Sequence, residues 1–302
     1  MKALGLGLLL LAVALTPVSA QVTVELTQDQ NQFLPAESMP LAVRITNRSG
    51  QNLRLGRSED WLTFSVETRE GEVVPKLGEV PVGEEFVLES SRVVTLRVDL
   101  APYFALNRSG RYSVTATMQI KDWNQSVRSQ PRSFDIIEGA RLWVQEIGVP
   151  NSALGTNGTP EIRKFILQQA NDARSQLRLY VRLTDASGAR TFRVFPIGRM
   201  VAFGRPEPQV DKFSNLHLLY QGGPHSFNYA VINPDGEIIA RRTYDYADTR
   251  PRLQPDAEGK ILVTGGLRRP TPQDVPSSKA AKVTGAEPNP TPSPGEMMPP
   301  EL

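Results

Sequence analysis

Two histidines and three acidic pairs are the side chains of this chain best suited to chemistry. His217 and His225 fall in one predicted hairpin, so they could approach each other and, with a carboxylate, bind Zn²⁺. No His-Glu-x-x-His spacing supports such a site. A histidine within a strand is more often held by structural hydrogen bonds. We therefore expect no metal site and no cofactor.

The three acidic pairs are Glu59-Asp60, Glu84-Glu85 and Asp235-x-Glu237. A glycosidase needs two carboxylates that face each other across a cleft, but these pairs lie in or beside predicted turns, where carboxylates are usually solvated. The sequence has no Gly-x-Ser-x-Gly nucleophile elbow and no cysteine, and hence no thiol nucleophile. We expect a protein that is not an enzyme. A hydrolase whose site combines residues distant in the sequence stays open.

Aromatic side chains could contact a ligand instead. Trp61 falls on the opposite face of its predicted strand from Leu62 and Phe64, so it is predicted to point outward. An exposed ring of this kind could stack on a sugar or on a partner side chain. Trp61, Trp123 and Tyr220 are therefore candidate ligand contacts. For Trp61 the simpler interpretation is a ring that covers a loop end or a domain seam.

The first 20 residues have the pattern of a secretory signal peptide. Lys2 gives a basic start, Leu4–Leu15 is apolar, and Val18-Ser19-Ala20 is a small-residue cleavage signature that would leave Gln21 first. No later apolar run reaches about 18 residues, so no membrane-spanning segment is expected after cleavage. The expected location is secreted or periplasmic.

Length and charge bound the rest. The chain has 302 residues, 34 basic and 32 acidic, with a formal net charge of +2. This length suits two domains, and the weak charge does not favour a nucleic-acid partner. Without disulfides, each domain must be held by burial of apolar side chains.

Residues 21–138 alternate apolar and polar side chains again and again, which predicts half-buried antiparallel strands. Turn clusters separate about seven strands. The predicted strands centre on residues 22–26, 41–45, 62–66, 86–88, 94–100, 112–120 and 133–137.

The segment Leu106–Tyr112 resembles the corner before the penultimate strand of immunoglobulin-like domains. The resemblance implies that the Tyr112 hydroxyl bonds to nearby backbone. Val114 stands where antibody domains have cysteine, so the similarity is to the disulfide-free sandwiches of bacterial secreted and surface proteins. It implies an immunoglobulin-like β-sandwich over 21–138.

Residues 139–160 are predicted to be a linker, in which Leu142–Val144 and Ile147 form a short strand or line the seam between domains, and 161–268 a second domain rich in β-hairpins. Ile162–Ala173 fits a helix or a strand and turn, and we favour the strand. A further turn is predicted at Pro196–Gly198. Asn233–Gly236 and Gly259–Val263 resemble the hairpin and strand of β-propeller blades. About one or two blades would fit, which implies a small antiparallel domain or a lone blade-like sheet.

Residues 269–302 include nine prolines and no aromatic residue, so this tail is predicted to be disordered. The whole sequence thus predicts an all-β protein with two domains. We expect an exported, non-enzymatic binding or scaffold protein of the cell envelope, whose partner is an envelope protein or a glycan. A carbohydrate-binding accessory module is the alternative, and a hydrolase is a third possibility.

Overall fold

The computed structural model describes residues 22–149, 161–172 and 175–275 of the chain. The predicted signal peptide over 1–20 lies outside the described residues. Residues 150–160 of the predicted linker lie outside them too, and so does the predicted tail beyond Val275.

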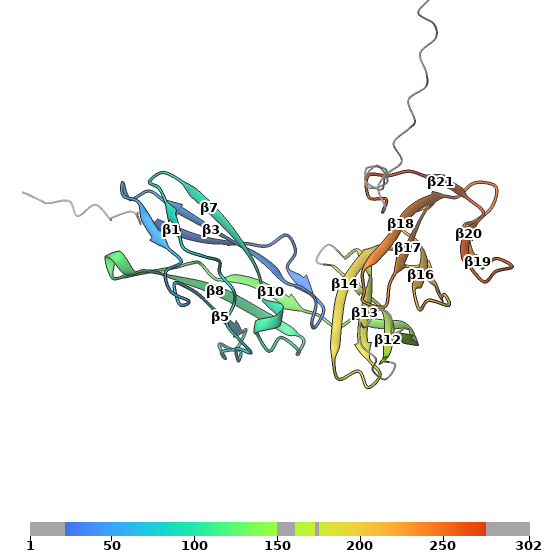
Figure 1. Ribbon diagram of the computed structural model, residues 1–302, viewed down its shortest axis with the longest axis horizontal. Helices are drawn as coiled ribbons and strands as arrows, with labels where there is room; N and C mark the ends of the chain where they lie inside the picture. The colour runs from blue at the N-terminus through green and yellow to red at the C-terminus, as the bar shows by residue number, and fades with distance from the viewer. Residues whose placement is uncertain (1–21, 150–160, 173–174, 276–302) are drawn as a thin grey trace, which may run out of the picture. The chain divides into compact units, whose positions relative to one another are not determined.

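The chain divides into two compact units between Gly139 and Ala140. Figure 1 shows that strands make up nearly all of the regular structure in both units. In the described ranges, 3₁₀ turns occur at Ala101–Tyr103 and Lys121–Trp123. The prediction of an all-β protein built mainly of antiparallel sheets is confirmed.

Unit 1, described over residues 22–139, has two main sheets around one core. One sheet has the order β1-β3-β7, and the other has the order β2-β10-β8-β5 with β9 beside β8. A small β4–β6 pair completes the unit. The strands are β1 (Val22–Thr27), β2 (Gln32–Phe33), β3 (Pro40–Asn47), β4 (Leu53–Leu55), β5 (Leu62–Thr68), β6 (Phe86–Leu88), β7 (Val93–Asp99), β8 (Gly110–Ile120), β9 (Gln125–Arg128) and β10 (Arg132–Ile136).

The predicted alternation accounts for the core of unit 1. Leu41, Val43 and Ile45 on β3 are fully buried, and the residues between them face away. Every pairing in the unit is antiparallel except β10 with β2, where Asp135 and Gln32 are parallel partners. The strands that alternation did not predict, β2, β4 and β9, span two to four residues. Such a length is too short to establish a period.

The predicted tyrosine contact is confirmed. The Tyr112 hydroxyl donates a hydrogen bond to the Arg108 carbonyl at 2.8 Å. The Tyr112 ring stacks on Phe134 with ring centroids 5.6 Å apart, and Phe134 meets Phe33 edge-on. The corner therefore joins the start of β8 to the aromatic centre of the core.

Unit 2, described from Ala140 to Val275 with two gaps, has two sheets and a separate hairpin. The orders are β11-β12-β13-β14 and β15-β16-β17-β18-β21, and the hairpin is β19–β20. The strands are β11 (Ala140–Val149), β12 (Glu161–Asn171), β13 (Leu177–Asp185), β14 (Thr191–Arg199), β15 (Glu207–Val210), β16 (Leu216–Gln221), β17 (Ser226–Ile232), β18 (Ile238–Asp245), β19 (Arg252–Pro255), β20 (Ile261–Thr264) and β21 (Leu267–Arg269).

The five-stranded sheet of unit 2 buries side chains on both faces. Leu218 and Ala230 belong to the core shared with the four-stranded sheet. Their neighbours along the strands, Leu219 and Tyr229, face the other way and pack with Leu253 of the hairpin. Since successive side chains of a strand point to opposite faces, β16 and β17 read as continuous apolar runs.

Three predictions about unit 2 are corrected. The short strand or seam predicted within the linker is the ten-residue β11, which pairs with β12 over nearly its whole length, so residues 140–149 belong to the sheet. No turn occurs at Pro196–Gly198, because β14 continues through Pro196. This strand lies at a sheet edge and has a register irregularity there, both of which tolerate proline. The ordered chain also passes residue 269, since Val275 pairs with Arg241.

Two further predictions concern the hairpins. Ile162–Ala173 contains strand β12, as favoured, and the chain turns after Asn171. The two blade-like motifs do not repeat one structure. Asn233–Gly236 forms a turn of the five-stranded sheet, whereas Gly259–Val263 belongs to the two-stranded hairpin.

Candidate functional site

The main candidate site is a cleft in unit 2 between the hairpin β19–β20 and the face of the five-stranded sheet. We call it the hairpin cleft, and its volume is about 460 Å³. Its floor includes side chains of β16, β17 and β18, and its opposite wall is formed by β20 and the preceding turn Glu258–Lys260. The turn between β15 and β16 closes one end with Asp211–Phe213.

A hydrogen-bonded network of three side chains lies at the floor of the hairpin cleft. His217 Nε2 is 3.1 Å from Asp211 Oδ2, and His217 Nδ1 is 2.8 Å from the Tyr229 hydroxyl. The carboxylate can only accept, so Nε2 carries the proton toward Asp211. In a neutral imidazole, Nδ1 then accepts from Tyr229. The network satisfies both ring nitrogens of a histidine that is only 7% exposed.

The turn Asp211–Asn215 explains how the carboxylate is positioned. Asp211 Oδ1 accepts hydrogen bonds from the backbone N–H groups of Phe213 and Asn215, at 2.9 and 2.8 Å. Oδ2 also accepts from the Asn215 amide at 3.0 Å. Burial opposes ionisation, but these bonds and the one from His217 outweigh it and lower the pKa of Asp211. The carboxylate is therefore charged at neutral pH.

Tyr229 has the opposite character. Burial, reinforced by the nearby Tyr244 and Asp211, raises the pKa of Tyr229 to about 12, although Arg242 opposes the shift. The hydroxyl is therefore protonated at neutral pH and serves as a hydrogen-bond donor. A phenol held in this state is poorly suited to act as a nucleophile, so the network orients groups more readily than it reacts.

The rim of the hairpin cleft combines apolar and basic side chains. Phe213, Ile239 and Leu262 are 61%, 45% and 40% exposed. The basic side chains are Lys212, Arg242 and Lys260, and Glu258 adds one exposed carboxylate.

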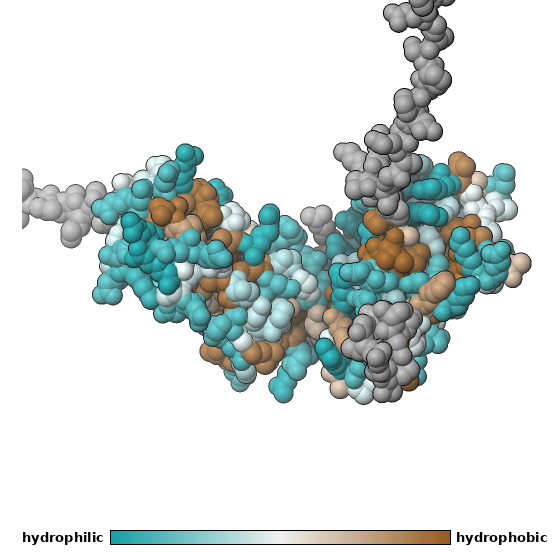
Figure 2. Space-filling view, in the orientation of Figure 1, coloured by the Kyte–Doolittle hydropathy of each residue, from teal (hydrophilic) through white to brown (hydrophobic). Residues whose placement is uncertain are grey.

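All three basic side chains are exposed, and none forms an ion pair within the described ranges. Lys212 lies over the Phe213 ring, 5.4 Å from its centroid. Figure 2 shows apolar surface only as separate patches among hydrophilic side chains on the face in view. A rim with apolar groups and unpaired positive charges suits a ligand that is both anionic and partly apolar.

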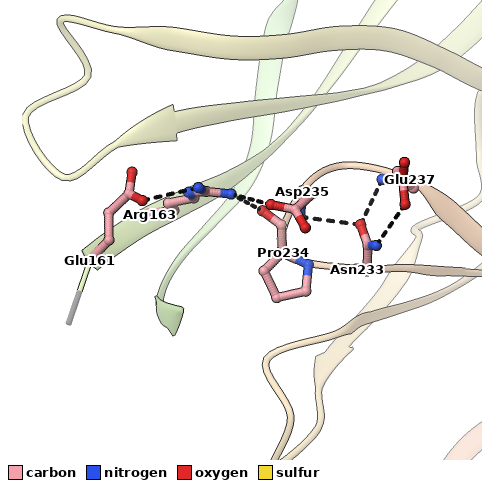
Figure 3. Close-up of polar contacts among 6 residues, drawn as sticks. All are labelled: Glu161, Arg163, Asn233, Pro234, Asp235 and Glu237. Carbon is pink, nitrogen blue, oxygen red and sulfur yellow. Dashed lines mark hydrogen bonds and ion pairs between the residues drawn. The ribbon is translucent and has the colours of Figure 1, made fainter. Parts of the chain in front are cut away.

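A second polar cluster in unit 2 is structural. Arg163 on β12 donates to the Pro234 carbonyl at 2.7 Å and to carboxylate oxygens of Asp235 at 2.8 Å and Glu161 at 2.9 Å (Figure 3). Its guanidinium also lies 4.6 Å from the centroid of the Phe192 ring. Burial opposes the charge, but the hydrogen bonds to both carboxylates keep the pKa of Arg163 above its ordinary value. The cluster ties the four-stranded sheet to the β17–β18 turn.

The side chains best suited to chemistry by residue type are not brought together. His217 pairs with Val231, whereas His225 is exposed in the turn at the far end of the same hairpin. The described residues contain no group of three or more side chains that could hold a metal ion. Each acidic pair has one member in an ion pair, namely Asp60 with Lys121, Glu85 with Arg57, and Asp235 with Arg163.

The predicted exposure of two aromatic residues is wrong. Trp61 is 2% exposed and packs edge-on against Phe86, because it precedes β5 and its ring turns into the core of unit 1. Tyr220 is 4% exposed, and its hydroxyl donates to the Ile197 carbonyl at 3.2 Å. Trp123 is partly buried against the same core as Trp61. None of the three lines the hairpin cleft.

Sequence reasoning missed Asp211 and the basic rim. Three hairpin turns share one backbone pattern, in which an Asx residue accepts from the backbone two and four residues ahead. In two of these turns the residue with positive φ is a glycine, Gly236 or Gly259, and a glycine at this position is the usual sequence signal of a turn. The turn at Asp211 has Ser214 there, at φ +64°, so the usual glycine signal is absent.

No protein-family model and no curated protein matches this sequence. Among solved structures, the sporulation control protein Spo0M from Bacillus subtilis is similar over 57% of this chain and 83% of its own chain. The sequence identity is 8% and the TM-score is 0.30, and this likeness carries no argument about the present chain. In the described residues, no helix is long and apolar enough to cross a membrane.

Proposed function

We propose that the chain is an exported, non-enzymatic binding protein of the cell envelope, and that its ligand occupies the hairpin cleft. The observation that carries the proposal is the rim of this cleft. It presents three exposed apolar side chains beside three basic side chains without ion-pair partners in the described ranges. Export is supported by the signal-peptide pattern of residues 1–20.

The chemistry of the cleft floor favours binding over catalysis. His217 forms hydrogen bonds with both Asp211 and Tyr229, and burial keeps Tyr229 protonated. A hydrolase of the serine type would need a hydroxyl nucleophile with a free base beside it.

Unit 1 supports the same class of protein. Its two sheets, the parallel β2–β10 pair and the Tyr112 corner are consistent with an immunoglobulin-like sandwich. Such domains commonly serve as binding or spacing modules, but the fold alone does not define a function.

A fluorescent probe of matching chemistry tests the proposal. Anilinonaphthalene sulfonate combines one anionic group with apolar rings, and we expect it to bind residues 21–302 at one saturable site. Arg242→Gln and Leu262→Ser should each weaken this binding, whereas the exposed Arg252→Gln, outside the cleft, should not. Equal binding by all variants would contradict the proposal. So would hydrolysis of ester, peptide or glycoside substrates that Asp211→Asn abolishes.

One observation favours carbohydrate binding in unit 1 as a second candidate. The indole Nε1 of Trp61 is buried without a hydrogen-bond partner in the described structure. Trp61 borders a cavity of about 450 Å³ that is also lined by Glu59 and Glu79. A tryptophan N–H and the carboxylates of the cavity lining are groups that can hydrogen-bond the hydroxyl groups of a sugar.

A glycan array of the purified protein tests this second candidate. Trp61→Phe keeps an aromatic ring but removes the N–H, so it should reduce retention of any bound glycan. Unchanged retention by this variant, or an array without signal, would remove the candidate.

A further inference from the structure

The outer edge of β20 has backbone groups that β19 does not use. Asp256 N–H donates to the Lys260 carbonyl, which sets the phase of the hairpin. Two residues further along, Gln254 and Leu262 are therefore the next hydrogen-bonded pair in the register. The N–H and C=O groups of Ile261 and Val263 consequently point away from β19.

The corresponding edge of β19 confirms this phase. Pro255, which has no N–H to donate, lies opposite Ile261. The Leu253 backbone points outward and is satisfied by side chains of β15: its N–H donates to Glu207 at 3.3 Å, and its C=O accepts from Gln209 at 3.3 Å. β19 is thus covered, whereas β20 pairs with no second strand in the described ranges.

The open edge borders the hairpin cleft. Ile261 and Val263 line the cleft, and so do the exposed Leu262 and the basic Arg242 and Lys260. Folded proteins usually blunt or cover an apolar strand edge because it can pair with another chain. Here the edge instead faces a space of about 460 Å³ that is lined by apolar side chains, by Lys212, Arg242 and Lys260, and by the single exposed carboxylate of Glu258.

We infer that the hairpin cleft binds an extended, acidic peptide segment of a partner protein, which adds as a strand to the outer edge of β20. The inference rests on the proposed binding function. Backbone pairing with Ile261 and Val263 supplies the alignment, and the side chains of Arg242 and Lys260 select acidic residues.

Charge favours this occupant over a second copy of the chain. A second copy would bring a rim with the same three basic side chains, Lys212, Arg242 and Lys260, to the cleft. Charges of the same sign repel one another, so this partner lacks charge complementarity. An acidic segment has the complementary charge.

The test uses synthetic hexapeptides that displace anilinonaphthalene sulfonate from residues 21–302. The acidic probe is acetyl-Val-Glu-Val-Glu-Val-Glu-amide, and its charge-reversed control replaces each glutamate with lysine. We expect the acidic probe to displace the dye and the basic control to bind at least roughly tenfold more weakly. Equal displacement by both would overturn the inference.

Backbone methylation separates strand addition from charge attraction. Alternate N–H groups of a strand point to one edge, so N-methylation of one alternate set should weaken binding and that of the other set should be tolerated. Loss of one or two hydrogen bonds predicts a weakening of roughly tenfold or more. If both methylated peptides bind as the parent does, no strand is added. The inference then fails, while dye binding still supports the proposed cleft.

Protein variants provide an independent readout. Val263→Pro removes an outward N–H without touching the bonds to β19, so it should weaken the acidic peptide but leave dye binding intact. Arg242→Gln should weaken both, and Arg252→Gln neither. A chain ending at Val275 should bind the peptide as the full chain does. If only that shortened chain binds, or if the full chain dimerises and Val263→Pro prevents it, the occupant is the chain itself and the inference is overturned.

Discussion

The two units bury similar alternating strands but cover them differently. In unit 1, two sheets enclose a single core, and Phe33, Phe134 and Leu41 are no more than 1% exposed. In the described part of unit 2, the five-stranded sheet is covered on one face by a four-stranded sheet and on the other by the two-stranded hairpin. A cover of two strands is too narrow to close the face. The comparison indicates that a strand pattern typical of a core leaves a cleft, which is the proposed binding site, where the cover is incomplete.

The buried polar side chains of the two units also differ in what their hydrogen bonds support. In unit 1, Asn47 is fully buried, and its amide donates to the carbonyls of Gln51 and Leu88 at 2.7 and 2.9 Å. This side chain completes the backbone hydrogen bonds of a loop. In unit 2, His217 and Tyr229 form a hydrogen bond with each other at the floor of a cleft. The first arrangement stabilises the fold alone, whereas the second also fixes the shape of a site.

Removal of Phe134 should break the closed core of unit 1. Phe134→Ala deletes a fully buried ring that contacts Phe33 and Tyr112, and we expect the free energy of unfolding to fall by about 3–5 kcal/mol. Urea unfolding followed by hydrogen exchange would locate the loss in unit 1. Val93→Ala, at a side chain 45% exposed, is the control and should change stability by less than about 0.5 kcal/mol. Equal effects would contradict a closed core.

Removal of the Arg163 side chain should weaken the polar contacts between the two sheets of unit 2. Arg163→Ala removes four contacts, and we expect a destabilisation of about 3 kcal/mol, at the low end for a buried ion pair because Asp235 is 51% exposed. Chemical denaturation measures the effect. The exposed Arg141→Ala on β11 serves as the control. A change of less than about 1 kcal/mol would show that the sheets are held by their apolar core alone.

Much of this comparison could be predicted from the sequence, because a period of two identifies a strand wherever one face is buried. This period located strands such as β3 and β8, and clusters of glycine and asparagine or aspartate located the turns. It could not assign the cover of each face, since β16 and β17 are apolar on both sides. The spacing of apolar residues along a strand does not show whether a four-stranded sheet or a hairpin packs on a given face.

The candidate site was less predictable for a related reason. His217 was named, but its partners depend on register. Pairing of His217 with Val231 and of Leu219 with Tyr229 places the histidine and the tyrosine on one face. Asp211 reaches the same face through a turn whose positive-φ position is Ser214 instead of glycine. Neither fact has a local sequence signal.

The tyrosine corner of unit 1 offers a smaller test of the same contrast. Tyr112→Phe keeps the stack on Phe134 but removes the hydrogen bond to Arg108, so we expect a loss of about 1 kcal/mol. Thermal and urea unfolding would measure it. Binding of anilinonaphthalene sulfonate to the hairpin cleft should be unchanged. Altered dye binding would contradict the view that this hydroxyl serves only the core of unit 1.

The smallest expected effect concerns the pH dependence of unit 2. Hydrogen bonds lower the pKa of folded Asp211 below its ordinary value of 3.8, although burial opposes the shift. Its stabilising contribution is therefore present above the unfolded pKa and is lost as the pH falls through the lower folded pKa. We expect the difference in unfolding free energy between the native chain and Asp211→Asn to shrink below about pH 4. Urea unfolding of both proteins across a pH series measures it, with the exposed Asp248→Asn as the control. A difference that grows on acidification would mean that the carboxylate is held in the fold at a net cost, and the cleft floor would then be strained rather than merely complete.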